Sequence, residues 1–351
     1  MSATRVELGV GLSTYPKRER NVLGLDIGGA NLKAAHTNGT ARSVPFPLWR
    51  EPQRLAQELE ALLNSMSAFD TLAITMTGEL CDCFQTKREG VEHILDAVTN
   101  AMAATDTTLR VWQTTGTFAD LAIAKRHSIQ TAAANWQALA VFVSRLVPEG
   151  AALLVDVGTT TTDIIPLVDG KPSPRGLTDV ARMQTKELVY TGVERTPVCA
   201  LLGSRVMAEL FATTLDVYLL LESIPETEST NTADGRTATI PNAHARMSRM
   251  LGGDPEMCSL EETTRLARDT AAIQEAMLQE AVQTVVREMA AKPERVILSG
   301  SGEFLARKVA LRRGFDEAQL VSLNDHLGSE ISSAACAHAV AVLASEEKSR
   351  L

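Results

Sequence analysis

The sequence predicts an α/β protein of two domains, each built on a sheet that starts from one copy of a repeated strand–turn–strand unit. The first copy spans residues 23–33 and the second spans residues 153–165. Each copy has an apolar strand that ends in an Asp, a glycine turn and a second strand. A hairpin turn signal follows each copy, Asn38-Gly39 and then Asp169-Gly170. The matching order and spacing favour an internal repeat over two unrelated hairpins.

Length and composition support this class and limit the partners. A chain of 351 residues has room for two domains with separate cores. The net charge of −9 argues against a nucleic-acid or anionic-membrane partner. No apolar run is long enough to span a bilayer, so we expect a cytoplasmic protein that acts on a small phosphorylated molecule. Five dispersed cysteines argue against a disulfide framework. The sequence leaves open whether the protein forms a homo-oligomer.

The domain boundaries follow from the positions of the two copies. Residues 1–21 are polar and are expected to form a loose N-terminal extension. The first domain is predicted to cover residues 22–148. The second is predicted to cover residues 149–351, with a C-terminal helix of small residues near the hinge.

The elements of the first half can be justified in order. Residues 22–49 predict a three-stranded meander, with prolines that mark an edge strand. Apolar residues at helical spacing and short buried runs predict the remaining elements. These are helix 52–66, strand 71–77, helix 88–104, strand 109–114 and helix 131–146.

The second half adds a polar middle region. Residues 222–242 are predicted to form a mobile loop, because they are rich in Thr, Ser, Asp and Gly. Arg246 and Arg249 follow on a helix whose basic face either meets an anionic substrate or is only solvated. Residues 204–221 fit a strand or a helix. The remaining predicted elements are helices 260–271 and 273–291, strand 296–299 and helix 332–344.

The two repeated turns have the chemistry of a phosphate and cation clamp. Glycine lets the backbone N–H groups approach an anion closely. Asp26 and Asp156 are candidate catalytic residues and ligands of a hydrated Mg²⁺ ion, which prefers oxygen ligands. Lys33 is a candidate catalytic cation beside the same phosphate. The candidate phosphate-binding residues of the turns are Gly28, Gly29, Asn31, Gly158, Thr159, Thr160 and Thr161. The alternative is a pair of ordinary hairpins.

Other candidates come from polar groups after strands and in turns. Glu79 follows a buried strand, so it is either a catalytic base or metal ligand, or a carboxylate at a helix N-terminus. Asn135 and Trp136 either line the crevice or pack in the core. The hydroxyl-rich stretch 187–197 contains the substrate-binding candidates Tyr190, Arg195 and Thr196. Gly300 and Gly302 lie after a late strand and suit the approach of a phosphate or nucleoside.

These features together resemble the acetate kinase, sugar kinase, Hsp70 and actin superfamily. The resemblance implies two ribonuclease H-like domains with a central crevice, and it makes Gly300 and Gly302 the counterpart of the adenosine segment. Four motifs resemble one branch, the hydantoinase/oxoprolinase-related proteins linked to tetrahydromethanopterin one-carbon transfer. The motifs lie at residues 28–33, 75–80, 134–136 and 187–197. Lys186 stands where that branch is expected to have Gly.

The resemblance to this branch implies a reaction. This branch includes an archaeal enzyme that condenses an aminomethylfuran diphosphate with γ-glutamyltyramine in methanofuran synthesis. A transferase that forms an aryl ether and releases diphosphate is therefore the leading hypothesis. A small-molecule kinase or oxoprolinase-like hydrolase, with ATP as cosubstrate, remains an alternative. A nucleotide-controlled binding protein without a product of its own is a second alternative.

Overall fold

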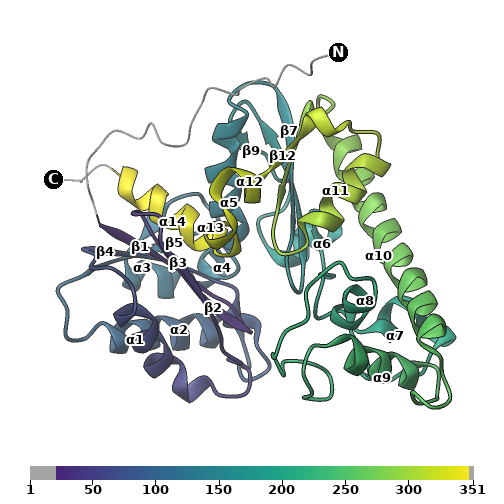
Figure 1. Cartoon of the computed structure of the whole chain (residues 1–351). Coiled ribbons are helices and arrows are strands. Elements are labelled where there is room, and N and C mark those ends of the chain that lie inside the picture. Colours follow the sequence, from purple (N-terminus) through teal and green to yellow (C-terminus); the bar gives the residue numbers. More distant parts are fainter. Residues whose placement is uncertain (1–20, 348–351) are drawn as a thin grey trace. The chain divides into compact units, whose positions relative to one another are not determined.

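The computed structural model describes residues 21–347, which divide into two compact units (Figure 1). Residues 21–148 and 334–347 form the first unit, and Glu149–Ser333 forms the second. Residues 1–20 of the predicted N-terminal extension lie outside the described part of the chain. Each unit has its own sheet, as the repeated strand–turn–strand units predicted.

The first unit contains a six-stranded sheet in the order β3-β2-β1-β4-β5-β6. Strand β1 pairs antiparallel with β2 and parallel with β4. The predicted three-stranded meander is present, and β3 is the edge strand that the prolines indicated. The strands are β1 (Val22–Ile27), β2 (Asn31–His36), β3 (Ala41–Pro45), β4 (Thr71–Met76), β5 (Thr108–Trp112) and β6 (Phe118–Ala119).

Helices cover this sheet because its strands are apolar on both sides. The α-helices are α1 (Leu55–Asn64), α2 (Lys87–Ala101), α3 (Leu121–Arg126), α4 (Ser128–Thr131), α5 (Asn135–Val143) and α14 (Ala335–Glu346). The short 3₁₀ helices are η1 (Pro52–Arg54), η2 (Gly78–Leu80) and η3 (Ser144–Leu146). Leu23, Leu25 and Ile27 belong to the core cluster that includes Leu59 of α1 and Ile94 of α2. Residues 24 and 26 therefore point to the opposite face of the sheet.

Helix α14 belongs to the first unit, although the sequence assigned residues 149–351 to the second domain. It packs on β1 and against α5. Gly24 makes this approach possible, because a Cβ atom there would collide with the backbone of Ala337. Its Ala-rich sequence suits close packing on a strand, so a segment from the chain terminus completes the first unit.

The second unit repeats the arrangement of the first. Its sheet has the order β10-β8-β7-β11-β12, and β9 also pairs with β8. Strand β7 pairs antiparallel with β8 and parallel with β11, as β1 pairs with β2 and β4. The strands are β7 (Ala151–Val157), β8 (Thr162–Val168), β9 (Lys171–Pro172), β10 (Leu188–Val189), β11 (Arg295–Ser299) and β12 (Leu320–Ser322).

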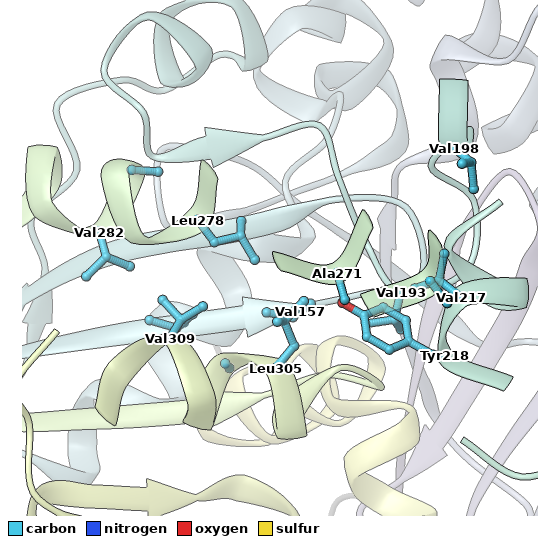
Figure 2. Close-up of a cluster of buried hydrophobic side chains, with 14 of the residues drawn as sticks. Val157, Val193, Val198, Val217, Tyr218, Ala271, Leu278, Val282, Leu305 and Val309 are labelled. Carbon is cyan, nitrogen blue, oxygen red and sulfur yellow. The ribbon is translucent and has the colours of Figure 1, made fainter. Parts of the chain in front are cut away.

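Long helices of the second unit pack on one face of this sheet. Val157 of β7 lies among the side chains of Leu278 of α10 and Leu305 of α11 (Figure 2). The α-helices are α6 (Asp179–Gln184), α7 (Val198–Leu202), α8 (Thr214–Leu220), α9 (Ile240–Met250), α10 (Leu260–Glu288), α11 (Glu303–Arg312), α12 (Leu323–Leu327) and α13 (Ser329–Ser333). The short 3₁₀ helices are η4 (Gly203–Arg205) and η5 (Glu317–Gln319). Asp156 alternates with the core residues of β7 and points to the opposite face.

In this region one prediction needs correction and one open alternative is decided. Residues 260–288 form one continuous helix, where the sequence suggested two; Ser259 and Glu262 form its capping box. The ambiguous stretch 204–221 contains helix α8, which also begins with a capping box. Within residues 21–347, no helix combines the length and the apolar character that crossing a membrane requires.

Candidate functional site

The two repeated hairpins have the same geometry. Gly28 N donates to the Asn31 carbonyl oxygen at 3.0 Å, and Gly158 N donates to the Thr161 carbonyl oxygen at 2.9 Å. In the strand register, Asp26 pairs with Lys33, and Asp156 pairs with Asp163. The two turns therefore match residue for residue. The equivalent positions differ in charge, since the first hairpin has Lys33 where the second has Asp163.

Asp26 is a buried carboxylate at the end of β1. It is 6% exposed, and its Oδ1 atom has no hydrogen-bond partner among the described residues. Burial raises the pKa of Asp26 to about 6, and the nearby charge of Lys33 opposes this shift. A buried oxygen acceptor without a donor is unfavourable in the free protein, so a cation or a donor from a ligand would compensate for it.

Glu79 lies against the first turn. It belongs to η2, which directly follows β4, and its neighbour Gly78 packs on the backbone of Gly28. The Glu79 side chain is buried, and Lys87 Nζ lies 3.5 Å from its Oε1 atom. The structure thus places this carboxylate in the segment that supports the first turn, beside a cation.

Asn135 and Trp136 begin helix α5. The Asn135 Oδ1 atom accepts a hydrogen bond from its neighbour's backbone N–H at 2.7 Å, and Trp136 is buried. Ala133, just before the helix, has a φ of 47°, an uncommon conformation for a residue other than glycine. A role for Asn135 and Trp136 in substrate binding stays a prediction.

The segment after β10 packs against the second turn and donates hydrogen bonds to it. Val193 N donates to the Gly158 carbonyl oxygen at 3.0 Å, and Arg195 N donates to the Thr159 carbonyl oxygen at 3.1 Å. A Cβ atom on Gly192 would lie 2.5 Å from the Gly158 oxygen. Glycine is therefore required at 192, because any side chain there would push the turn out of place. The structure brings the predicted motif 187–197 into contact with the predicted phosphate turn.

The individual substrate-binding candidates of this motif differ in accessibility. Tyr190 is exposed and Arg195 is partly buried. The Thr196 side chain is buried, and its hydroxyl contacts Gly192 N at 3.1 Å and the Thr191 hydroxyl at 2.9 Å. Thr196 thus shapes the turn around Gly192, whereas Tyr190 has a surface available to a ligand.

Lys186 has a φ of 64°. This left-handed conformation favours glycine, which is the residue expected at this position from the motif. The next residue, Glu187, is buried and accepts hydrogen bonds from Arg175 N at 2.6 Å and Gly176 N at 2.9 Å. Glu187 therefore fixes the loop that contains Arg175 and Gly176. The presence of Lys186 in place of the expected glycine introduces backbone strain.

Gly300 and Gly302 pack on the end of β7. Gly300 has a φ of 90°, and a Cβ atom on it would lie 2.6 Å from Asp156 Oδ1. Gly302 N donates to the Val157 carbonyl oxygen at 2.8 Å. Contacts within the protein are sufficient to require glycine at 300, so this residue by itself gives no support to an adenosine site.

Arg246 does not form the solvated or substrate-facing basic surface that the sequence suggested. It is buried, and it donates to Asp216 Oδ1 at 2.7 Å and to Asp234 Oδ1 at 2.9 Å. Burial raises the pKa of Asp216 to about 6, against the effect of Arg246. Asp234 lies in the segment 222–239 that precedes α9, so this ion pair attaches the segment to α9. The last residues of the predicted loop, 240–242, already belong to that helix. Sequence reasoning missed the pairing because the three residues meet only in the folded chain.

A second internal repeat follows the two central parallel strands. At the end of β4 the sequence reads Thr75-Met76-Thr77-Gly78-Glu79-Leu80, and at the end of β11 it reads Ser299-Gly300-Ser301-Gly302-Glu303-Phe304. The register pairs Thr75 with Asp26 and Ser299 with Asp156. The signal is present in the sequence, but only the strand register shows that the two segments are equivalent.

The donor set fits a hydrated magnesium ion. No group of three or more His, Cys, Asp or Glu side chains within residues 21–347 is arranged for direct metal binding. Magnesium keeps several waters and is held by one or two carboxylates together with phosphate oxygens. The buried Oδ1 atom of Asp26 is an oxygen acceptor of this kind.

The class of protein follows from the topology. Two sheets, each with an antiparallel hairpin joined to parallel strands, have the arrangement of two ribonuclease H-like domains, which is the predicted fold. A nucleotide-free acetone carboxylase structure has the same fold, with a TM-score of 0.56 and 11% identity over 92% of this chain and 70% of that chain. The profile of the hydantoinase/oxoprolinase family matches residues 70–346, so the chain belongs to that family.

Two archaeal relatives share most of their length with this chain. A Methanocaldococcus jannaschii protein named (4-{4-[2-(gamma-L-glutamylamino)ethyl]phenoxymethyl}furan-2-yl)methanamine synthase is 34% identical over 335 residues, which cover 92% of this chain and 97% of the relative. A Methanococcus vannielii protein with the same name is 32% identical over 219 residues, which cover 59% of this chain and 96% of the relative.

Proposed function

We propose that this protein is a transferase that joins an aminomethylfuran diphosphate to a tyramine-type phenol in methanofuran-type cofactor synthesis. The observation that carries the proposal is the 34% identity over 92% of the chain to a synthase whose named product contains a phenoxymethyl link to a furan. In the reaction, the bond between the furfuryl carbon and the diphosphate oxygen breaks. A bond from the phenol oxygen to that carbon forms, and the phenol proton passes to a base.

The hairpins supply the groups for the leaving diphosphate in this proposal. Asp26 and Asp156 are the proposed ligands for magnesium, which would neutralise negative charge on the leaving group. Lys33 adds a positive charge beside Asp26, as its register position allows. The N–H groups of the turns at Gly28 and Gly158 provide donors for phosphate oxygens.

Glu79 is the base in this proposal. Its carboxylate is buried, and the ammonium group of Lys87 lies 3.5 Å from its Oε1 atom. Proton removal by a positioned base typically accelerates a reaction by about 10²–10⁴-fold. The exposed ring of Tyr190 and the side chain of Arg195, next to the second turn, are the proposed contacts for the organic part of the substrates.

The proposed setting follows from the same relatives. Furan cofactors of this type carry one-carbon units, so we propose a role in tetrahydromethanopterin-linked metabolism in the cytoplasm. We also propose that the partners are small phosphorylated molecules, with no nucleic acid or membrane.

The test is a reaction without ATP. Purified protein is incubated with a furfuryl diphosphate, a tyramine compound and Mg²⁺, and diphosphate, ADP and the ether are measured in parallel. The donor is already activated, so we expect diphosphate release and ether formation, with the phenol oxygen retained in the ether. Asp26→Asn should be inactive, whereas Asp106→Asn, on the exposed surface, should match wild type.

The alternatives give different products. A kinase or an oxoprolinase-like hydrolase would require ATP and release ADP when the acceptor is present. Acceptor-dependent ADP formation without diphosphate would refute the transferase and establish that alternative. A binding protein without its own product would bind nucleotide and release neither compound in proportion to the acceptor.

A further inference from the structure

In each unit, a hydroxyl residue is paired with the Asp of the repeated hairpin. Thr75 of β4 pairs with Asp26 of β1, and Ser299 of β11 pairs with Asp156 of β7. Both pairs are in parallel register, and directly paired residues project to the same face of a sheet. Each hydroxyl is therefore the neighbour of its Asp side chain, on the face opposite the main core of its unit.

These hydroxyls are buried without hydrogen bonds. Thr75 and Ser299 are fully buried, and neither side-chain oxygen has a partner among the described residues. Beside Thr75, the Oδ1 atom of Asp26 also lacks a partner. A buried polar group without a partner is unfavourable. The first unit thus has an unused donor on Thr75 in register with an unused acceptor on Asp26.

The recurrence of this arrangement argues against chance. Both hydroxyl residues begin the six-residue segment that the two units share, and Gly-Glu follows at the same distance in each copy. In the first unit, the Gly of this segment packs on the turn at Gly28; in the second, Gly302 donates to the end of β7. The hydroxyl thus occurs twice at the same position relative to a hairpin Asp.

We propose that Thr75 and Ser299 are positioning residues that orient the carboxylates of Asp26 and Asp156 as magnesium ligands. The inference rests on the proposed function, in which each of these Asp residues is a magnesium ligand. A carboxylate that binds a metal with one oxygen is usually fixed by a hydrogen bond to the other, and loss of such a partner typically lowers metal affinity by about 10–100-fold. The hydroxyl of each positioning residue donates this hydrogen bond when the cation is bound.

The experiment compares metal-dependent binding with the stability of the free protein. Binding of magnesium diphosphate is measured by calorimetry for wild type, Thr75→Val and Ser299→Ala, with magnesium ATP as a second arm. We expect each variant to lose about 10–100-fold in affinity. The unfolding midpoint of each free variant should equal or exceed that of wild type, because the removed hydroxyl had no partner. Thr75→Ser retains the hydroxyl and should keep the affinity.

The matched control is Thr71→Val, at the start of the same strand and on the same face. It should leave the affinity unchanged. Wild-type affinity in both Thr75→Val and Ser299→Ala, or a lower unfolding midpoint with unchanged affinity, would overturn the inference while leaving the proposed function intact. If wild type binds magnesium ATP but not magnesium diphosphate, the proposed reaction is refuted. The affinities of the Thr75 and Ser299 variants for magnesium ATP then test the inference. Binding of neither compound by wild type refutes both.

Discussion

Replacing Asp26 with asparagine should stabilise the free protein at neutral pH and abolish its binding of magnesium diphosphate. Burial raises the pKa of Asp26 from 3.8 to about 6. Because the folded pKa lies above the unfolded value, the native state binds the proton more tightly. The stability that this provides is full below about pH 4 and is lost as the pH rises through about 6. Asparagine keeps the size of the side chain and removes the charge.

The magnitude follows from the pKa shift. A difference of about two pKa units corresponds to roughly 3 kcal/mol in the free energy of unfolding above pH 6. The variant also leaves Lys33 without its neighbouring carboxylate, which costs about 0–1 kcal/mol for a partly exposed pair. We therefore expect a net gain of about 2–3 kcal/mol at pH 7.5. The gain should disappear near pH 4, where the wild-type carboxyl is protonated.

Urea unfolding at pH 7.5 and pH 4 measures this difference, and calorimetry measures binding. Asp106→Asn is the control, because it changes the same charge on the exposed surface. It should show no comparable difference between the two pH values. A lower stability of Asp26→Asn at pH 7.5 would refute the reasoning, since it would mean that the ionised carboxylate is favourably solvated or paired in the free protein.

Three further predictions concern the turns and their support. Asp156→Asn should abolish turnover and preserve folding; an unchanged rate of diphosphate release at saturating Mg²⁺ would exclude Asp156 from the site. Lys186→Gly should stabilise the fold by about 0.5 kcal/mol, because the left-handed backbone costs a lysine about 1–2 kcal/mol and the greater chain entropy of glycine offsets part of the gain. Lys186→Ala should give no gain, and a loss of stability in the glycine variant would contradict this reasoning. Gly192→Ala should weaken magnesium diphosphate binding by at least about tenfold and destabilise the fold by about 1–3 kcal/mol, because its Cβ atom would collide with Gly158. Wild-type affinity in that variant would show that the second turn tolerates displacement.

The sheets are predictable from the sequence because their signals are local. The strand that ends in Asp26 and the strand that ends in Asp156 are short apolar runs with a glycine turn at a fixed distance. The same local reading assigned residues 334–347 to the wrong unit. Helix α14 packs on β1, more than 300 positions away in the chain, through a contact that depends on Gly24. A pattern within the helix does not specify which strand it covers.

The candidate site is predictable to a similar extent. The turns, Glu79 and the motif 187–197 were identified from residue types, and the structure adds that this motif contacts the second turn. Their chemical roles stay predictions. Sequence reasoning did not find the roles of Thr75 and Ser299, because these depend on strand register. It also misjudged Arg246, whose charge is compensated by residues that become neighbours only on folding.

The differences between the two hairpins indicate a division of roles. In the first, the register sets a cation, Lys33, beside Asp26. In the second it sets Asp163 beside Asp156, and Arg182 donates to Asp163 at 2.7 Å. Burial raises the pKa of Asp163, and Arg182 opposes this effect. The first hairpin thus places a cation beside its carboxylate, whereas the second pairs two carboxylates, one of which is balanced by Arg182 of the same unit. The duplicated hairpin therefore carries different charges in the two units, although the same backbone hydrogen bond closes each turn.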